Sequence, residues 1–202
     1  MTHADINAAA PTTSGRALIV VDVQRDFCEG GALGVSGGHA VAESVSRLLA
    51  DQHGYATVVA TRDHHIDPGD HFSTEPDFVD SWPPHCVAGT PGVEFDDQLT
   101  FRDFAAIFDK GEYSAAYSGF EGTEPGGARL ADWLRAQGIG EVEICGIATD
   151  HCVRATALDA AREGFATTVL LDLTAAVAAD RVQQVSDELA GAGVSLRGVV
   201  AG

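Results

Sequence analysis

The stretch "EVEICGIATDHCVRATALDAAREGFATTVLLD" (residues 141–172) decides the fold class. Residues 141–147 have the pattern of a buried strand, and residues 151–164 place apolar side chains at helical spacing before Gly164 ends the run. A second apolar strand pattern follows at 166–172. A strand, a helix and a second strand in this order predict two parallel strands that are covered on both faces.

The same alternation extends over most of the chain. Further strands are predicted at 17–22, 56–63, 105–110 and near 194–200. Further helices are predicted at 39–54 with Gly54 as C-cap, at 128–138 with Gly138 as its stop, and around 180–191. We therefore predict a single-domain, doubly wound α/β fold over residues 17–202, with a mostly parallel sheet and helices on both faces. Residues 1–16 are predicted to be a loose N-terminal tail.

The composition excludes several classes of partner. The net charge is −18, from 30 acidic and 12 basic side chains, so a surface for nucleic acid or anionic lipid is not expected. No run of 18 apolar residues occurs, and the N-terminus has no basic flank before an apolar segment. The 4 cysteines include no Cys-x-x-Cys pair. Together these features predict free thiols and a cytoplasmic location.

Polar side chains stand where the predicted strands end. Asp22, Asp63 and Lys110 end the first three strands, and Cys152 follows the fourth strand through a short turn. Ligands of open α/β sheets bind beyond the carboxyl ends of the strands. Each residue alone could be structural, but four different polar groups at one edge indicate a site.

Cys152 is either a buried structural thiol or a nucleophile. Its position at the start of the predicted helix favours an anion and predicts a lowered thiol pKa. Beside it, Asp22 could accept the thiol proton and Lys110 could stabilise both anions, which would form a Cys-Asp-Lys triad. The other cysteines are expected to be packing residues.

The segment "DHHIDPGDHF" (63–72) is dense in metal-ligand types. Alternation along an extended segment directs Asp63 and His65 to one side and His64 to the other. The turn "DPGD" can bring in His71, and His85 can come from later in the irregular region 64–104. Three imidazoles and a carboxylate suit Zn²⁺, Mn²⁺ or Fe²⁺, although a polar loop with surface histidines has the same spacing. The glycine-rich "GALGVSGG" (31–38) is interpreted as a flexible loop over the site.

Five segments in this order resemble the isochorismatase-like cysteine hydrolases, and among them the nicotinamidases (pyrazinamidases). They are "VDVQRDF" (21–27), "TRDHHIDPGDHF" (61–72), "WPPHCVAGTPG" (82–92), "KGEYSAAYSGF" (110–120) and "GIATDHCVRATALDA" (146–160). The resemblance covers roughly residues 17–195. It implies hydrolysis of nicotinamide to nicotinate and ammonia, with pyrazinamide as a plausible second substrate.

The resemblance also implies roles for individual residues. Cys152 would be the nucleophile, with Asp22 and Lys110 as its catalytic partners. One divalent metal ion (Zn, Fe or Mn) would be held by Asp63, His65, His71 and His85. A cis peptide bond between Ile147 and Ala148 would aim the N–H groups of Ala148 and Cys152 at the substrate oxygen. Residues expected to contact the substrate are Phe27, Trp82, Tyr117, Ile147, Ala148 and His151.

Other functions remain open at this stage. One alternative is a related amidase for another small amide, and a second is a metal hydrolase whose bound hydroxide attacks directly. Isochorismate cleavage fits less well because it does not need the thiol, and a binding protein without catalysis would not need the triad. The chain is expected to be a monomer or a small homo-oligomer. His64 beside His65 leaves open an exchange of ligands, although the alternation argues against it.

Overall fold

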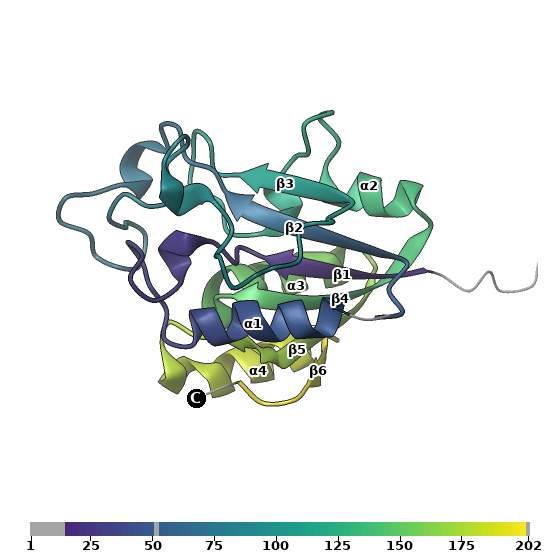
Figure 1. Ribbon diagram of the computed structural model, residues 1–202. Coiled ribbons are helices and arrows are strands. Elements are labelled where there is room, and N and C mark those ends of the chain that lie inside the picture. Colours follow the sequence, from purple (N-terminus) through teal and green to yellow (C-terminus); the bar gives the residue numbers. More distant parts are fainter. Residues whose placement is uncertain (1–14, 51–52, 201–202) are drawn as a thin grey trace, which may run out of the picture.

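A six-stranded sheet organises residues 15–50 and 53–200, which are the residues that the computed structural model describes (Figure 1). Its strands are β1 (Gly15–Val21), β2 (Thr57–Asp63), β3 (Ala106–Lys110), β4 (Ile139–Ile147), β5 (Ala166–Ala175) and β6 (Ser195–Arg197). They lie in the order β3-β2-β1-β4-β5-β6, and every pairing is parallel. This order confirms the predicted doubly wound sheet, and it places the change of winding direction between β1 and β4.

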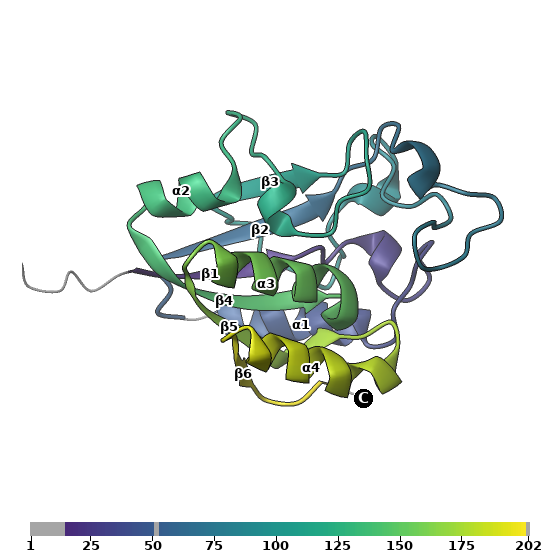
Figure 2. The same ribbon diagram turned by 180° about the vertical axis from the view of Figure 1, so that it is seen from behind.

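Four α-helices of the described residues cover the sheet. They are α1 (Gly38–Leu49), α2 (Leu130–Ala136), α3 (Arg154–Arg162) and α4 (Val182–Gly191). The helix α1 lies on the face that is seen in Figure 1, whereas α2, α3 and α4 lie on the face that is seen in Figure 2. None of the described helices is long and apolar enough to cross a membrane.

The central strand β1 connects the two halves of the core. Ala17, Ile19 and Val21 pack with α2, α3 and α4, while Leu18 and Val20 pack with α1. Successive side chains of a strand point to opposite faces, so a strand covered on both sides must be apolar throughout. This requirement explains the run "ALIVV" and confirms the interpretation of the continuous apolar segments as buried strands.

The long connection between β2 and β3 folds over the carboxyl ends of the strands. It has only short 3-10 turns, at Gly69–His71 and Pro91–Val93. Isolated bridges pair His65 with Val87 and Phe72 with Trp82, so the excursion returns on itself beside the sheet edge. Its irregular character agrees with the sequence prediction.

Several predicted boundaries shift. The strand β1 begins at Gly15, and most of the expected tail, residues 1–14, lies outside the described residues. The first helix ends at Leu49 rather than at Gly54, because Leu49 is its last buried apolar residue and Ala50 caps it. Gly54, with φ +73°, lies in the turn before β2. Residues 51–52 are outside the described part of the chain.

Candidate active site

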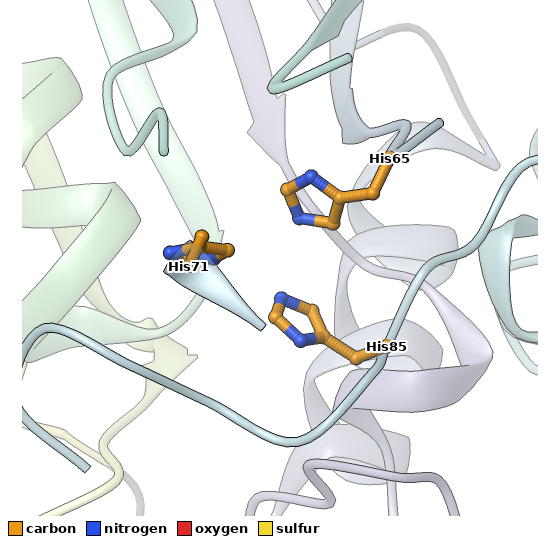
Figure 3. A group of neighbouring side chains, drawn as sticks. All are labelled: His65, His71 and His85. Atoms are coloured by element: carbon orange, nitrogen blue, oxygen red, sulfur yellow. The ribbon is translucent and has the colours of Figure 1, made fainter. Parts of the chain in front are cut away.

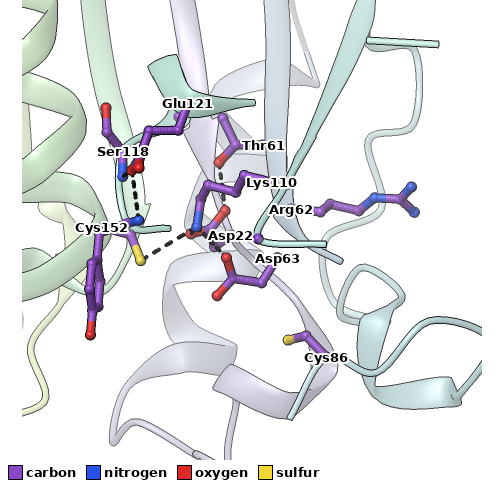
Figure 4. A network of polar contacts seen from close by, with 12 residues as sticks. Asp22, Thr61, Arg62, Asp63, Cys86, Lys110, Ser118, Glu121 and Cys152 are labelled. Atoms are coloured by element: carbon purple, nitrogen blue, oxygen red, sulfur yellow. Dashed lines mark hydrogen bonds and ion pairs between the residues drawn. The ribbon is translucent and has the colours of Figure 1, made fainter. Parts of the chain in front are cut away.

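Three strand ends bring Asp22, Asp63 and Lys110 together. The ammonium Nζ of Lys110 lies 2.9 Å from Oδ2 of Asp22 and donates a hydrogen bond to Oδ1 of Asp63. The same Nζ lies 3.8 Å from Sγ of Cys152 (Figure 4). All four side chains are buried. Parallel strands end at one edge, and this common edge explains why residues far apart in the sequence meet here.

Burial and mutual charge determine the protonation of this cluster. Burial would lower the pKa of Lys110, but the carboxylates of Asp22 and Asp63 raise it well above its ordinary value, so the ammonium stays charged. Burial raises the pKa of Asp22, although Lys110 opposes that shift. For Asp63, burial is outweighed by Lys110, His65 and His85, and its pKa falls below the ordinary value. Asp63 is therefore the more strongly ionised carboxylate, and Asp22 is the better proton acceptor.

Cys152 lies within a helical segment that begins at Thr149, two residues before the predicted start of the helix at residue 151. Residues Thr149–Val153 form a π-helical turn, and the α-helix proper begins at Arg154. The predicted lowering of its thiol pKa is wrong. Burial raises the pKa of Cys152 well above its ordinary value, Lys110 opposes the shift, and Asp22 adds to it. A helix start alone does not offset the removal of the sulfur from water, so the resting group is a thiol that needs a base.

The base candidate lies next to that thiol. Ligand-type atoms of Asp22, Asp63 and Cys152 all lie within 4.8 Å of one another. Asp22 also has φ +50°, an uncommon backbone conformation that aspartate tolerates better than most residues. Thr61 Oγ1 donates a hydrogen bond of 2.6 Å to Asp22 Oδ1, which fixes the orientation of the carboxylate.

Three histidines face one another beside this cluster. Ligand nitrogens of His65, His71 and His85 lie within 4.8 Å of each other, and the rings converge in Figure 3. Oδ2 of Asp63 lies 3.8 Å from Nε2 of His65 and 3.9 Å from Nε2 of His85. The predicted set of three imidazoles and one carboxylate is therefore assembled in space.

The ring nitrogens of this set have the tautomers that a metal ion requires. Nδ1 of His65 donates to the carbonyl of Gly111 at 2.6 Å, and Nδ1 of His85 donates to the carbonyl of Pro83 at 2.8 Å. A carbonyl only accepts, so each Nε2 keeps a lone pair. Nε2 of His65 and Nδ1 of His71 are buried without a hydrogen-bond partner. Orphaned nitrogens around one carboxylate fit a divalent transition metal ion.

His64 stays outside the cluster. Its Nδ1 lies 3.4 Å from Oε1 of Glu112, and it is not among the histidines whose ligand nitrogens converge. This placement confirms the alternation argument, in which Asp63 and His65 point together. The turn at residues 67–70 brings in His71 as predicted, with Gly69 at φ +61°.

A cavity of about 380 Å³ opens onto both the sulfur and the histidines. It is lined by Phe27, Ala32, Leu33, Gly34, Val35, Ser36, Asp63, His71, Phe78, Trp82, His85, Ala116, Tyr117, Ile147, Ala148, His151, Cys152, Ala176 and Val177. All six residues expected to contact a substrate are in this lining. The glycine-rich loop also contributes to the wall, as predicted. The Ile147–Ala148 peptide bond is cis, which agrees with the expectation from the resemblance.

Sequence reasoning missed residues that hold the site in place. The amide of Gln24 donates to the carbonyl of Asp63 at 2.8 Å and accepts from its N–H at 2.9 Å, so it clamps the backbone of this carboxylate. Thr61 was missed as well, although a residue two positions before Asp63 lies on the same face of β2. Phe78 and Val177 line the cavity from distant loops, where no local pattern marks them.

Comparisons with known proteins agree with this geometry. The isochorismatase domain family matches residues 16–198. The chain is 57% identical to the nicotinamidase/pyrazinamidase of Mycobacterium tuberculosis over 181 residues, which cover 90% of this chain and 97% of that protein.

Solved structures are similar in fold. An L. infantum protein in complex with nicotinate matches with a TM-score of 0.80 and 36% identity, over 92% of this chain and 93% of its own. The pyrazinamidase of Pyrococcus horikoshii in complex with zinc matches with a TM-score of 0.78 and 38% identity, over 90% and 98% of the two chains. This chain belongs to the isochorismatase family of hydrolases.

Proposed function

We propose that this protein hydrolyses nicotinamide to nicotinate and ammonia, and pyrazinamide to pyrazinoate, through a thioester on Cys152. One observation carries the proposal: the sulfur of Cys152 and the imidazoles of His71 and His85 open onto the same cavity. A small heteroaromatic amide can therefore present its carbonyl to the thiol and its ring nitrogen to the histidine cluster. The similarity to the nicotinamidase/pyrazinamidase of M. tuberculosis supports the same substrate.

The proposed metal ligands are Asp63, His65, His71 and His85, and the ion is Zn²⁺, Fe²⁺ or Mn²⁺. When bound, the ion supplies a Lewis acid that can hold the ring nitrogen and orient the substrate. The zinc complex of the P. horikoshii pyrazinamidase supports a divalent metal ion in this fold. The unpartnered nitrogens of His65 and His71 support it from this chain itself.

The walls of the cavity fit a flat aromatic ring. Trp82 and Tyr117 are joined by a hydrogen bond of 3.1 Å from the indole N–H to the phenol oxygen, which holds both rings in place. His151 packs edge-on against Trp82 with ring centroids 5.5 Å apart, and Phe27 packs against His85. We infer that Phe27, Trp82, Tyr117, Ile147, Ala148 and His151 enclose the substrate.

The chemical steps follow from the protonation of the cluster. Asp22 accepts the proton of the Cys152 thiol, and the sulfur attacks the amide carbon to form the C–S bond. The N–H groups of Ala148 and Cys152 are the proposed donors to the oxyanion. Ammonia then leaves as the C–N bond breaks and takes the proton from Asp22.

The second half of the reaction uses the same base. Asp22 takes a proton from water, whose oxygen attacks the thioester carbon. The C–S bond then breaks, Asp22 returns the proton to the sulfur to restore the thiol, and the acid product loses its proton to solvent as nicotinate. Throughout both halves, Lys110 stabilises the negative charge that passes between Asp22 and Cys152. A charged lysine at this position is consistent with its raised pKa.

A substrate panel tests the proposal. Ammonia release is measured with nicotinamide, pyrazinamide, benzamide and an aliphatic carbamoyl compound, and the metal content of the same protein is determined by elemental analysis. Benzamide is the matched control because it has the same shape without the ring nitrogen. Fast turnover of the two heteroaromatic amides and slow turnover of benzamide is the expected result. A preference for the aliphatic compound would instead identify a related amidase of the same superfamily.

The biological setting is also part of the proposal. All four cysteines are free thiols, which suits a reducing compartment, and we propose that the protein works in the cytoplasm. Release of nicotinate would place it in the salvage of pyridine nucleotides.

A further inference from the structure

A second cluster of metal-ligand side chains lies outside the catalytic residues. It consists of Cys28, His39 and Asp96, whose ligand-type atoms all lie within 4.8 Å of one another. Cys28 follows the short turn Arg25–Phe27, His39 is in the first turn of α1, and Asp96 follows the bridge between Gln24 and Phe95. Three separate segments therefore contribute one ligand type each: a thiol, an imidazole and a carboxylate.

The thiol and the imidazole of this cluster both contact the Asp96 carboxylate. Nδ1 of His39 is screened from solvent and lies 3.1 Å from Oδ2 of Asp96, and the Cys28 thiol is within hydrogen-bond reach of the same carboxylate. The other oxygen of Asp96, Oδ1, accepts the N–H of Gln98 at 3.0 Å, which leaves Oδ2 for the cluster. An imidazole nitrogen and a carboxylate oxygen that approach in this way can both direct lone pairs at a common ion.

The scaffold holds the three side chains in position. The backbone of Asp96 donates to Val23 and accepts a hydrogen bond of 3.0 Å from Arg102. Cys28 is fully buried, and its sulfur lies against Gly38, where an added Cβ would come within 3.2 Å of Sγ. Glu29 accepts the N–H of His39 at 2.8 Å and so fixes the start of α1.

Of the three side chains in the cluster, only that of His39 is partly exposed. The side chain of His39 is 37% exposed, whereas that of Asp96 is 5% exposed. An ion could enter along His39 and keep a water molecule as its fourth ligand. Burial and the Asp96 carboxylate raise the pKa of the Cys28 thiol, so an ion would have to displace its proton.

We propose that Cys28, His39 and Asp96 form a second metal site, which takes a thiophilic divalent cation of the Zn²⁺ class. Binding releases the Cys28 proton and forms bonds from the thiolate, the imidazole and the carboxylate to the ion. The two outer ligands enclose residues 29–38, and this loop carries Leu33 and Val35 into the catalytic cavity. An ion at this site therefore ties both ends of a cavity wall, and its role is structural or regulatory rather than catalytic.

Cobalt substitution tests the site through its thiolate. The full-length protein is titrated with Co²⁺, and the thiolate-to-cobalt charge-transfer band is followed in the ultraviolet spectrum. The control variant is Cys152→Ser, which removes the thiol of the catalytic centre and leaves the Cys28 thiol in place. The band is expected in the wild type and in Cys152→Ser, and it is expected to disappear in Cys28→Ser. A band that survives Cys28→Ser but is lost in Cys152→Ser would overturn the proposal, as would its absence from the wild type.

A second variant is needed because Cys28 is fully buried, and loss of the cobalt band in Cys28→Ser would also follow from misfolding. His39→Gln changes a partly exposed side chain and keeps the thiol. It is expected to weaken Co²⁺ binding at this site by more than about tenfold, while one equivalent remains bound at the histidine cluster. An unchanged binding isotherm in His39→Gln, with circular dichroism like that of the wild type, would contradict the assignment.

Discussion

Thr61 Oγ1 donates a hydrogen bond of 2.6 Å to Oδ1 of Asp22, and both side chains are fully buried. The hydrogen bond stabilises the ionised carboxylate and so lowers its pKa, whereas burial raises it. The threonine therefore keeps the proposed base ionised at a pH at which a buried carboxyl group would otherwise be protonated.

Thr61→Val is expected to move the acid limb of the kcat/KM profile to higher pH, because loss of a hydrogen bond to a charged group raises the pKa of Asp22. The base must be ionised to accept the thiol proton, so activity disappears earlier as the pH falls. The control is Thr167→Val, which removes a buried hydroxyl that donates to the carbonyl of Phe165. If the two variants gave the same profile, Asp22 would not be the titrating base.

Gly111→Ala is expected to weaken metal binding by about 10–100-fold. A Cβ at Gly111 would lie 2.6 Å from Cε1 of His65, so the imidazole would have to move. Gly127→Ala is the matched control: Gly127 has φ +88° against +77° for Gly111, but an added Cβ would meet nothing within 4 Å. The measurement is the metal content of each variant after dialysis. If both variants lost the same amount of metal, the cause would be the strained backbone conformation and not contact with His65.

Lys110→Met is expected to lower the free energy of unfolding by about 3–5 kcal/mol, because it leaves two buried carboxylates without their cation. The measurement is chemical denaturation in the presence of a chelator, so that metal binding does not contribute. Arg162→Met removes an exposed partner of Asp159 and is expected to change stability by less than about 1 kcal/mol. Equal stability of both variants would contradict the buried ion cluster.

Asp77→Ala is expected to raise KM several-fold with little change in kcat. Oδ1 of Asp77 accepts hydrogen bonds from the N–H groups of Val79, Asp80 and Ser81, and these bonds lower the pKa of Asp77. They order the loop that carries Phe78 into the cavity wall. The control is Glu75→Ala, which removes an exposed acidic side chain of the same loop. Steady-state kinetics with nicotinamide compare the KM of the two variants, and an equal KM in both would contradict a role of Asp77 in ordering the cavity wall.

Much of the architecture could be predicted because it depends on local patterns. The apolar run of β1 and the strand-helix-strand unit at 141–172 define the parallel sheet, and parallel strands bring Asp22, Asp63 and Lys110 to one edge. The alternation along the extended segment that follows β2 also separated His64 from His65 correctly. The end of α1 was misplaced because a glycine is a plausible cap, but only packing shows that Leu49 is the last residue in contact with the core.

The electrostatics of the site could not be predicted. The position of Cys152 near a helix start indicated a lowered thiol pKa, whereas burial of the sulfur has the larger and opposite effect. Burial depends on side chains that are far apart in the sequence, and no local pattern shows it. The cavity residues Phe78 and Val177 come from loops about 100 positions apart, so only the folded chain shows that they share a wall.

Ammonia release by Cys152→Ala tests the central claim most directly. The variant is compared with the wild type after both have been shown to contain the same amount of metal and to fold alike by circular dichroism. We predict that turnover of nicotinamide falls by about a thousandfold or more, because no other group can form the thioester. Turnover within about tenfold of the wild type, with metal still bound, would contradict the account and would favour direct attack by water at the histidine cluster.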